Sequence, residues 1–189
     1  MFWLDVAVKT TFVALLAFGA FSGLEQFDGK AFVWRLLTYP IVALVVPLGW
    51  HFAGRRLPYP YALDILLVSP FLVDVIGNVL DLYDTIDWWD DLNHFVNWAL
   101  LSLAVGQLVL RYRLPRFETF VLVVGVGAIA AILWELGEYI TFIRNSPEIA
   151  TAYTDTLGDM TLGLAGSTFA ALVTVKLLSG GGVLTRPPR

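Results

Sequence analysis

Long apolar stretches alternate with short polar connections along the chain. An α-helix needs about 20 mostly apolar residues to cross a bilayer. Six stretches approach that length, over residues 6–24, 33–52, 61–80, 94–110, 120–142 and 157–178. The pattern therefore predicts an all-α, polytopic integral membrane protein with six transmembrane helices, which together form a single transmembrane domain over residues 1–189.

The composition favours the same interpretation. Hydrophobic residues make up 58% of the chain and charged residues only 15%, whereas soluble domains carry about 25% charged residues. The first apolar stretch has no basic leader, which indicates a retained helix and not a cleaved signal peptide. The chain has no cysteine, and this excludes disulfides, thiolate metal ligands and cysteine nucleophiles.

Basic residues are unevenly distributed between the two sides that six spans define. The side that carries both termini has most of them, namely Lys9, Arg55, Arg56, Arg111, Arg113, Arg116, Lys176, Arg186 and Arg189. The other side has only Lys30, Arg35 and Arg144. Because cytoplasmic segments of membrane proteins are enriched in Lys and Arg, we expect both termini in the cytoplasm and the protein in the bacterial plasma (inner) membrane.

Polar residues lie within or directly beside four of the spans at one predicted depth, near the outer face. Their spacing of three or four positions places each set on one face of its helix. Span by span, they are Asp74, Asn78 and Asp81, then Asp90, His94 and Asn97, then Glu135 and Glu138, and finally Asp155 and Asp159. We expect the four sets to converge on one outward-facing site.

Carboxylates gathered inside a membrane need a balancing charge, because a charge at the centre of a span costs about 2.5–3.5 kcal/mol on insertion scales. A cation, protons or mutual hydrogen bonds could supply the balance. Oxygen donors dominate the set and favour Mg²⁺, Ca²⁺ or Mn²⁺, and a Zn²⁺ site with a His and carboxylates stays open. We predict a divalent metal site with the candidate ligands Asp74, Asp90, His94, Glu135, Glu138, Asp155 and Asp159.

Some of these residues also have a purely structural interpretation. Two pairs at helix starts fit capping and the helix dipole, namely Asp90 with His94 and Asp155 with Asp159. Nothing about helix formation requires Glu135 and Glu138, so these two acids carry most of the site prediction. At the cytoplasmic end, we expect Asp64 to pair with an arginine.

Three motifs in the second half of the chain resemble those of the YjdF-type bacterial inner-membrane proteins. They are D-x-x-x-H-F (Asp90, His94, Phe95), W-E-x-x-E (Trp134, Glu135, Glu138) and D-T-x-x-D followed by glycines (Asp155, Thr156, Asp159, Gly163, Gly166). The resemblance implies a family of unknown molecular function. The same region has a more distant likeness to VanZ-like proteins, which are associated with glycopeptide and lipoglycopeptide resistance at the cell envelope.

Three functions are consistent with this sequence. The first is an accessory or structural membrane component whose cation site holds the helices together. The second is a metal-dependent enzyme acting on a lipid-linked phosphate headgroup, which needs a basic clamp, and Arg144 is the only cation expected near the outer end. The third is a cation- or proton-coupled transporter, although only Ser102 and Gln107 continue a polar path inward. We favour the first, with membrane lipids and another membrane protein or a second copy of the chain as partners, and expect no nucleic acid.

Overall fold

The computed structural model describes residues 1–112 and 114–180. Six helical spans in this part of the chain are long and apolar enough to cross a membrane. They are Phe2–Phe21, Phe32–Phe52, Tyr61–Val79, Trp89–Tyr112, Arg116–Thr141 and Ala152–Leu177. The predicted all-α, six-span architecture is confirmed.

The fourth and sixth spans begin earlier than predicted. They start at Trp89 and Ala152, whereas the apolar stretches start about five residues later along the sequence. The additional first turns contain Asp90, Asp91 and Asp155. Acidic residues are favourable at a helix N-terminus because the helix dipole places a partial positive charge there. Polar helical turns therefore extend beyond the apolar stretches at this end of the bundle.

The second span is interrupted where it passes the candidate site. It consists of α2 (Phe32–Thr38), a 3₁₀ turn (Tyr39–Ile41) and α3 (Val42–Phe52). Pro40 lies in the turn and has no N–H to donate, so a regular α-helical hydrogen bond is lost there. Arg35 before this turn and Tyr39 at its start both contact α4, through Asp74 and Phe71 respectively.

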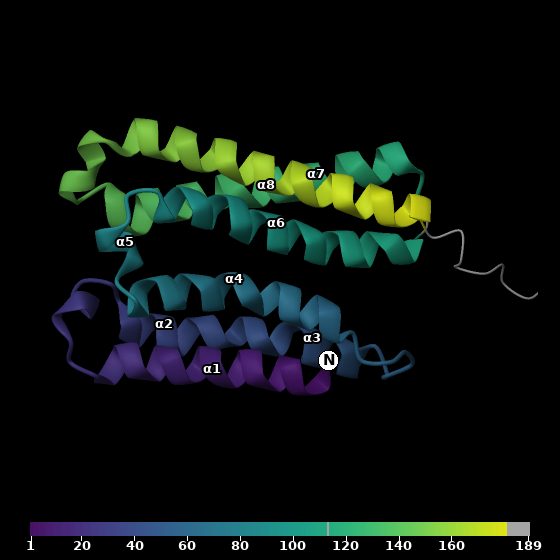
Figure 1. Cartoon of the computed structure of the whole chain (residues 1–189), viewed down its shortest axis with the longest axis horizontal. Helices are drawn as coiled ribbons and strands as arrows, with labels where there is room; N and C mark the ends of the chain where they lie inside the picture. The colour runs from purple at the N-terminus through teal and green to yellow at the C-terminus, as the bar shows by residue number, and fades with distance from the viewer. Residues whose placement is uncertain (113, 181–189) are drawn as a thin grey trace, which may run out of the picture.

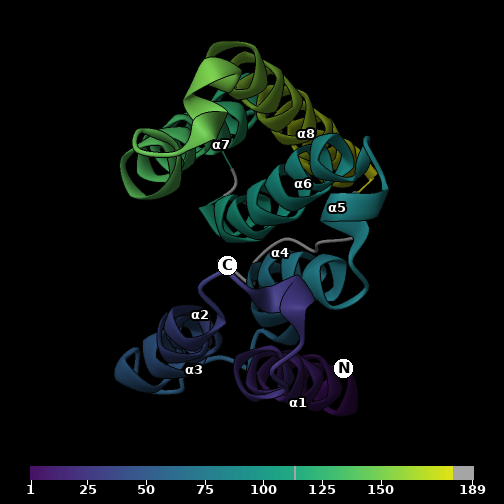
Figure 2. The same cartoon turned by 90° about the vertical axis from the view of Figure 1, so that its left-hand side faces the viewer.

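The remaining helices complete two groups, which are visible along the bundle in Figure 1 and from its end in Figure 2. They are α1 (Phe2–Phe21), α4 (Tyr61–Val79), α5 (Leu82–Thr85), α6 (Trp89–Val109), α7 (Arg116–Glu138) and α8 (Ala152–Gly180). In the N-terminal group, α1 packs against α2 and α4, and α3 packs against α4. In the C-terminal group, α6, α7 and α8 all pack against one another. The contact between α4 and α6 joins the two groups.

Close backbone contact holds α8 against α6. A Cβ atom added at Gly166 would lie 2.2 Å from the carbonyl oxygen of Phe95 and 3.0 Å from the backbone nitrogen of Ala99. Membrane helices use small residues for such close approach. Two glycines of α7 differ in how closely they are packed. An added Cβ atom would meet side chains at Gly127 but nothing within 4 Å at Gly125.

A buried polar cluster links α1 to α4 near the N-terminus. Asp64 is fully buried, forms an ion pair with Lys9 and accepts a hydrogen bond from the Tyr59 hydroxyl. The Lys9 Nζ also lies 3.4 Å from Asp5 Oδ2. The expected arginine partner for Asp64 is therefore wrong. The packing of α1 on α4 brings a lysine from inside the first span to this carboxylate. The two residues are 55 positions apart, so local sequence patterns do not predict their contact.

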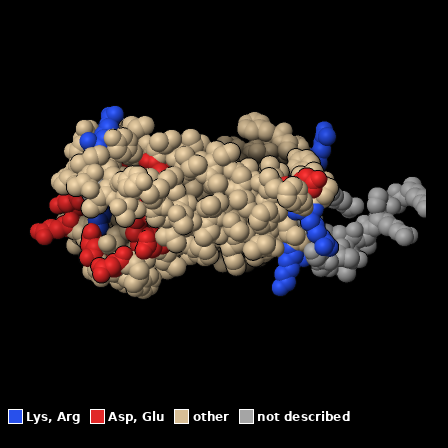
Figure 3. Space-filling view, turned by 90° about the horizontal axis from the view of Figure 1, so that it is seen from above, with Lys and Arg blue, Asp and Glu red and all other residues tan. Residues whose placement is uncertain are grey.

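Charged side chains separate to the two ends of the bundle (Figure 3). Acidic residues gather mainly at the end that carries α5, on the left in Figures 1 and 3, and basic residues mainly at the other end. The start of α1 and the end of α8 both lie at the basic end. We refer to these as the acidic end and the basic end.

We expect Gly166→Ala to destabilise the protein by about 1–3 kcal/mol, because the added methyl group overpacks a backbone contact that cannot move freely. Thermal unfolding in detergent, compared with wild type, measures the effect. Gly125→Ala is the matched control, since its Cβ would contact nothing within 4 Å. Equal unfolding temperatures for the two variants would contradict close α6–α8 packing as a source of stability.

Candidate functional site

A cavity of about 290 Å³ lies towards the acidic end, between the two helix groups. Residues of α4 and α6 line it together with residues from both flanking spans. Arg35 and Tyr39 reach it from the second span, and Trp134 and Glu138 reach it from α7. The cavity therefore draws on both halves of the chain.

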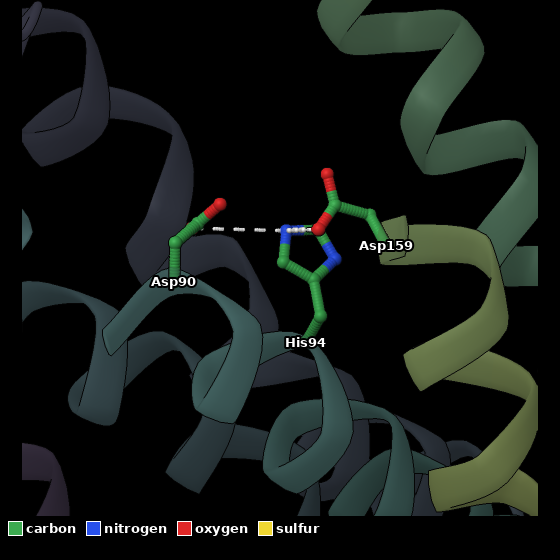
Figure 4. Close-up of side chains that lie close together, drawn as sticks. All are labelled: Asp90, His94 and Asp159. Carbon is green, nitrogen blue, oxygen red and sulfur yellow. Dashed lines mark ion pairs between the residues drawn. The ribbon is translucent and has the colours of Figure 1, made fainter. Parts of the chain in front are cut away.

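His94 occupies the centre of a cluster of carboxyl groups on one side of this cavity. Its Nε2 atom lies 3.6 Å from Asp159 Oδ1 and 3.8 Å from Asp90 Oδ1. Figure 4 shows the imidazole between these two carboxyl groups, which come from α8 and α6. On the other side of the ring, Nδ1 lies 3.6 Å from Glu135 Oε1 on α7. Three helices thus contribute to the surroundings of one imidazole.

Two overlapping sets of three side chains share His94. One set is Asp90, His94 and Asp159, and the other is His94, Glu135 and Glu138. Within each set, potential ligand atoms all lie within 4.8 Å of one another. We call these five residues the His94 cluster. The structure thus brings five of the seven predicted ligands together, while metal binding itself stays a prediction.

Most of the His94 cluster is buried. The side chain of His94 is 10% exposed, those of Glu135 and Asp159 are 4% and 6% exposed, and that of Asp90 is 50% exposed. Among the described residues, His94 Nδ1 and Glu135 Oε1 have no hydrogen-bond partner, and their separation of 3.6 Å is too long for a hydrogen bond. Buried polar atoms of this kind are costly unless a partner satisfies them.

No lysine or arginine in the described part of the chain forms an ion pair with the carboxyl groups of this cluster. Among the described residues, the ion pairs formed by Asp90, Glu135 and Asp159 involve only His94. A neutral imidazole cannot balance three carboxylates, and even a protonated one would leave excess negative charge. The cluster can therefore take up positive charge, either as protons or as a metal cation.

Asp74 is placed differently from the prediction that grouped it with these ligands. Arg35 Nη1 donates to Asp74 Oδ2 at 2.6 Å, and the Tyr83 hydroxyl donates to Asp74 Oδ1 at 3.0 Å. Asn78 Nδ2 lies 3.2 Å from the same Oδ1 atom. The charge of Asp74 is thus already balanced, and its carboxylate belongs to the part of the cavity lining formed with Arg35.

Asp155 also lies apart from the two ligand sets. Its side chain is exposed in the first turn of α8 and borders a separate surface hollow with Asp91. Asp159 lies one turn further along α8 and is buried. A spacing of four places both acids on one face of the helix, but the first turn extends past the packed part of the bundle. Sequence periodicity does not distinguish these two positions.

Arg35 was missed as a site residue, and the expectation that Arg144 is the only cation near this end is wrong. The Arg35 guanidinium lines the cavity and lies 5.6 Å from the centre of the Phe32 ring and 5.5 Å from that of Tyr39. A signal was present in the sequence, because Arg35 stands within the second apolar stretch, on the predicted acidic side. An ionisable residue in such a position is a functional candidate by itself.

A chain of polar side chains extends along the wall of the cavity, and sequence reasoning singled out its Asn97 but missed Tyr83 and Asn93. Asn93 Nδ2 donates to the Tyr83 hydroxyl, and Asn97 Nδ2 donates to Asn93 Oδ1 at 3.0 Å. Burial, together with the negative charge of Asp74, raises the pKa of the Tyr83 phenol. The hydroxyl therefore stays protonated and continues to donate to Asp74.

Fold and site together define a six-span α-helical membrane protein with a buried acidic and histidine cluster beside a cavity. The chain belongs to a family described as predicted membrane protein (DUF2238), which matches residues 7–180. The expected family of unknown molecular function is thereby confirmed, whereas the likeness to VanZ-like proteins is not shown. No curated protein and no solved structure matched the chain.

We expect Tyr83→Phe to lower the free energy of unfolding by about 1–3 kcal/mol, since it removes a donor from Asp74 and an acceptor from Asn93. Denaturant unfolding in detergent measures the change. Tyr153→Phe is the control, because Tyr153 is strongly exposed. A Tyr83→Phe variant as stable as this control would argue against the hydrogen-bond chain.

Proposed function

We propose that this membrane protein binds one divalent cation at the His94 cluster and that the ion holds α6 and α8 together. The observation that carries the proposal is the convergence of buried carboxyl groups on one imidazole without a lysine or arginine partner among the described residues. A mainly oxygen donor set favours Mg²⁺, Ca²⁺ or Mn²⁺, and the imidazole also permits Zn²⁺.

The two nitrogen atoms of the His94 ring have different neighbours, which favours one of them as the metal ligand. We place it at Nε2, with Asp90 and Asp159 as the carboxylate ligands. Ligand atoms about 2.1 Å from one ion lie about 3.0–3.4 Å apart at octahedral or tetrahedral angles. The observed separations of 3.6 and 3.8 Å from Nε2 are close to that range. Small side-chain adjustments would complete the coordination.

Glu135 then has a role of its own. Histidines that bind a metal through one nitrogen usually donate the other N–H to a carboxylate or carbonyl, which orients the ring. Glu135 Oε1 lies 3.6 Å from Nδ1 and has no hydrogen-bond partner in the described part of the chain. We assign it as the acceptor from Nδ1–H, with Glu138 as an additional carboxylate nearby. This arrangement would satisfy both buried atoms at once.

Packing beneath the cluster supports a binding role over the transport alternative. Ser102, one of the two residues expected to continue a polar path, is fully buried and donates to Ser167 Oγ at 3.0 Å. A Cβ atom at Gly127 would lie 2.2 Å from Ser167 Oγ and 2.4 Å from Ser102 Oγ. The hydroxyl groups here are used in helix packing, and the close contact leaves little room for a moving ion.

We also propose that the acidic end faces away from the cytoplasm in the bacterial inner membrane, with both termini inside. The support is the concentration of Lys and Arg at the basic end (Figure 3), where α1 begins and α8 ends. Positively charged residues are retained on the cytoplasmic side during insertion. In this orientation the His94 cluster lies near the outer face.

Elemental analysis of the detergent-purified protein tests the metal site. We expect close to one equivalent of a divalent metal in the wild type and none in Asp159→Asn, which loses a direct ligand. Glu135→Gln removes the charge but keeps an acceptor oxygen for Nδ1–H, so it should retain partial metal binding. We expect its metal affinity to fall by about 10–100-fold, as for other residues that orient a metal ligand. Asp87→Asn, at an exposed acid of the same end, should match the wild type. A metal-free wild type would refute the proposal.

We expect added metal to stabilise the folded protein, because a ligand that binds only the native state shifts unfolding by mass action. At a free concentration about 100 times Kd, the gain is about 2.7 kcal/mol. Thermal unfolding of chelator-treated protein, with and without each metal, measures it. The Asp159→Asn variant should show no gain. A similar gain in that variant would place the ion elsewhere.

A further inference from the structure

The cavity beside the His94 cluster is polar at one end and apolar at the other. Asp74 lines it on α4, and Phe71 lines it about one helical turn deeper. On α6, Leu101 lies seven residues, or about 10 Å, beyond His94. Because the acidic end is the polar end, the cavity runs from that end towards the middle of the bundle. Its polarity matches that of an amphiphile.

The lining also indicates how an amphiphile would enter. Figure 2 shows α7 and the α2–α3 segment on the same side of the α4–α6 contact, and both contribute to the cavity. Apolar side chains are exposed on both segments, namely Leu37 and Ile41 on the second span and Trp134, which also lines the cavity, on α7. Both flanking segments belong to candidate membrane spans, so their exposed surface adjoins lipid.

We infer that this cavity binds a phosphate-bearing membrane lipid, which enters from the bilayer between the second span and α7. The headgroup lies between Arg35 and the metal of the His94 cluster, and the inference thus rests on the proposed function. The acyl chain leaves along the apolar end, past Phe71 and Leu101.

Arg35 provides the recognition on one side of the headgroup. Its hydrogen bond to Asp74 uses one N–H of the five that a guanidinium offers. Contacts with the rings of Phe32 and Tyr39 hold the group in place. A planar guanidinium held in this way matches the geometry of phosphate oxygens and can bind two of them at once.

The metal provides the recognition on the other side. Mg²⁺ is commonly bound by one or two carboxylates, and substrate phosphates complete its coordination. Asp90 and Asp159 would supply the carboxylates, and Asp90 is half exposed towards the open side of the cluster. An anion can therefore approach a cluster that would repel it without the ion. Without metal, the same acids and aromatic residues would favour an ammonium headgroup instead.

Native mass spectrometry of the metal-loaded, detergent-solubilised protein provides the test. The probes are oleoyl lysophosphatidate, its phosphocholine analogue, monooleoylglycerol and inorganic phosphate. We expect lysophosphatidate to bind at least 10-fold more tightly than each of the other three, and a chelator to remove that advantage. Tighter binding of the phosphocholine analogue would identify an ammonium site, equal binding of monooleoylglycerol a non-selective groove, and equal binding of inorganic phosphate a site for the free anion. Each would overturn the inference.

The double variant Arg35→Gln with Asp74→Asn removes the guanidinium without leaving an unpaired carboxylate behind. We expect at least a 10-fold loss of lysophosphatidate affinity with unchanged metal content. Arg144→Gln, at an exposed arginine of the same end, is the control and should bind as the wild type does. Unchanged affinity in the double variant would overturn the role of Arg35.

A further variant tests the apolar end of the cavity, where the acyl chain is expected to bind. Its inorganic phosphate binding and metal content show whether the protein is still folded. Leu101→Trp fills the apolar part of the cavity, so it should weaken lysophosphatidate binding and leave inorganic phosphate binding unchanged. Metal content measured on the same samples separates the two proposals. Metal-loaded protein without selective lipid binding overturns the lipid site alone, whereas a wild type without metal overturns the metal site and this inference with it.

Discussion

The close approach of α8 to α6 determines the geometry of the candidate site. Gly166 allows the α8 backbone to contact that of α6 at Phe95 and Ala99. His94 immediately precedes Phe95, and Asp159 lies two turns before Gly166 on α8. The contact therefore fixes the register between the imidazole and the carboxylate. A larger residue at Gly166 would separate the helices and move these two groups apart.

Acidic residues inside this membrane protein are balanced in two different ways. Asp64 pairs with Lys9, and Asp74 pairs with Arg35, so each of these carboxylates has a cationic partner within the chain. The ion pairs of the His94 cluster instead involve only the imidazole among the described residues. Because burying unbalanced charge is costly, this difference is the basis of the proposed cation site.

The two helix groups contribute different chemistry to one cavity. The C-terminal group, in which glycines allow close packing, supplies the imidazole and all four carboxyl groups of the His94 cluster. The N-terminal group supplies the guanidinium of Arg35 and the aromatic ring of Tyr39. Since the contact between α4 and α6 joins the groups, this interface brings the His94 cluster and Arg35 to the same cavity. A ligand that bridges the walls would also connect the two halves of the protein.

The sequence by itself determined the number of spans and which helices carry polar residues, because apolar length and helical spacing are local properties. The convergence of Glu135 and Asp159 on His94 followed from topology and spacing alone. Only the tertiary structure decided that Asp74 pairs with Arg35 and that Asp155 is exposed. Those outcomes depend on how each helix is rotated about its axis and where it leaves the packed bundle. Both are set by contacts between residues distant in sequence.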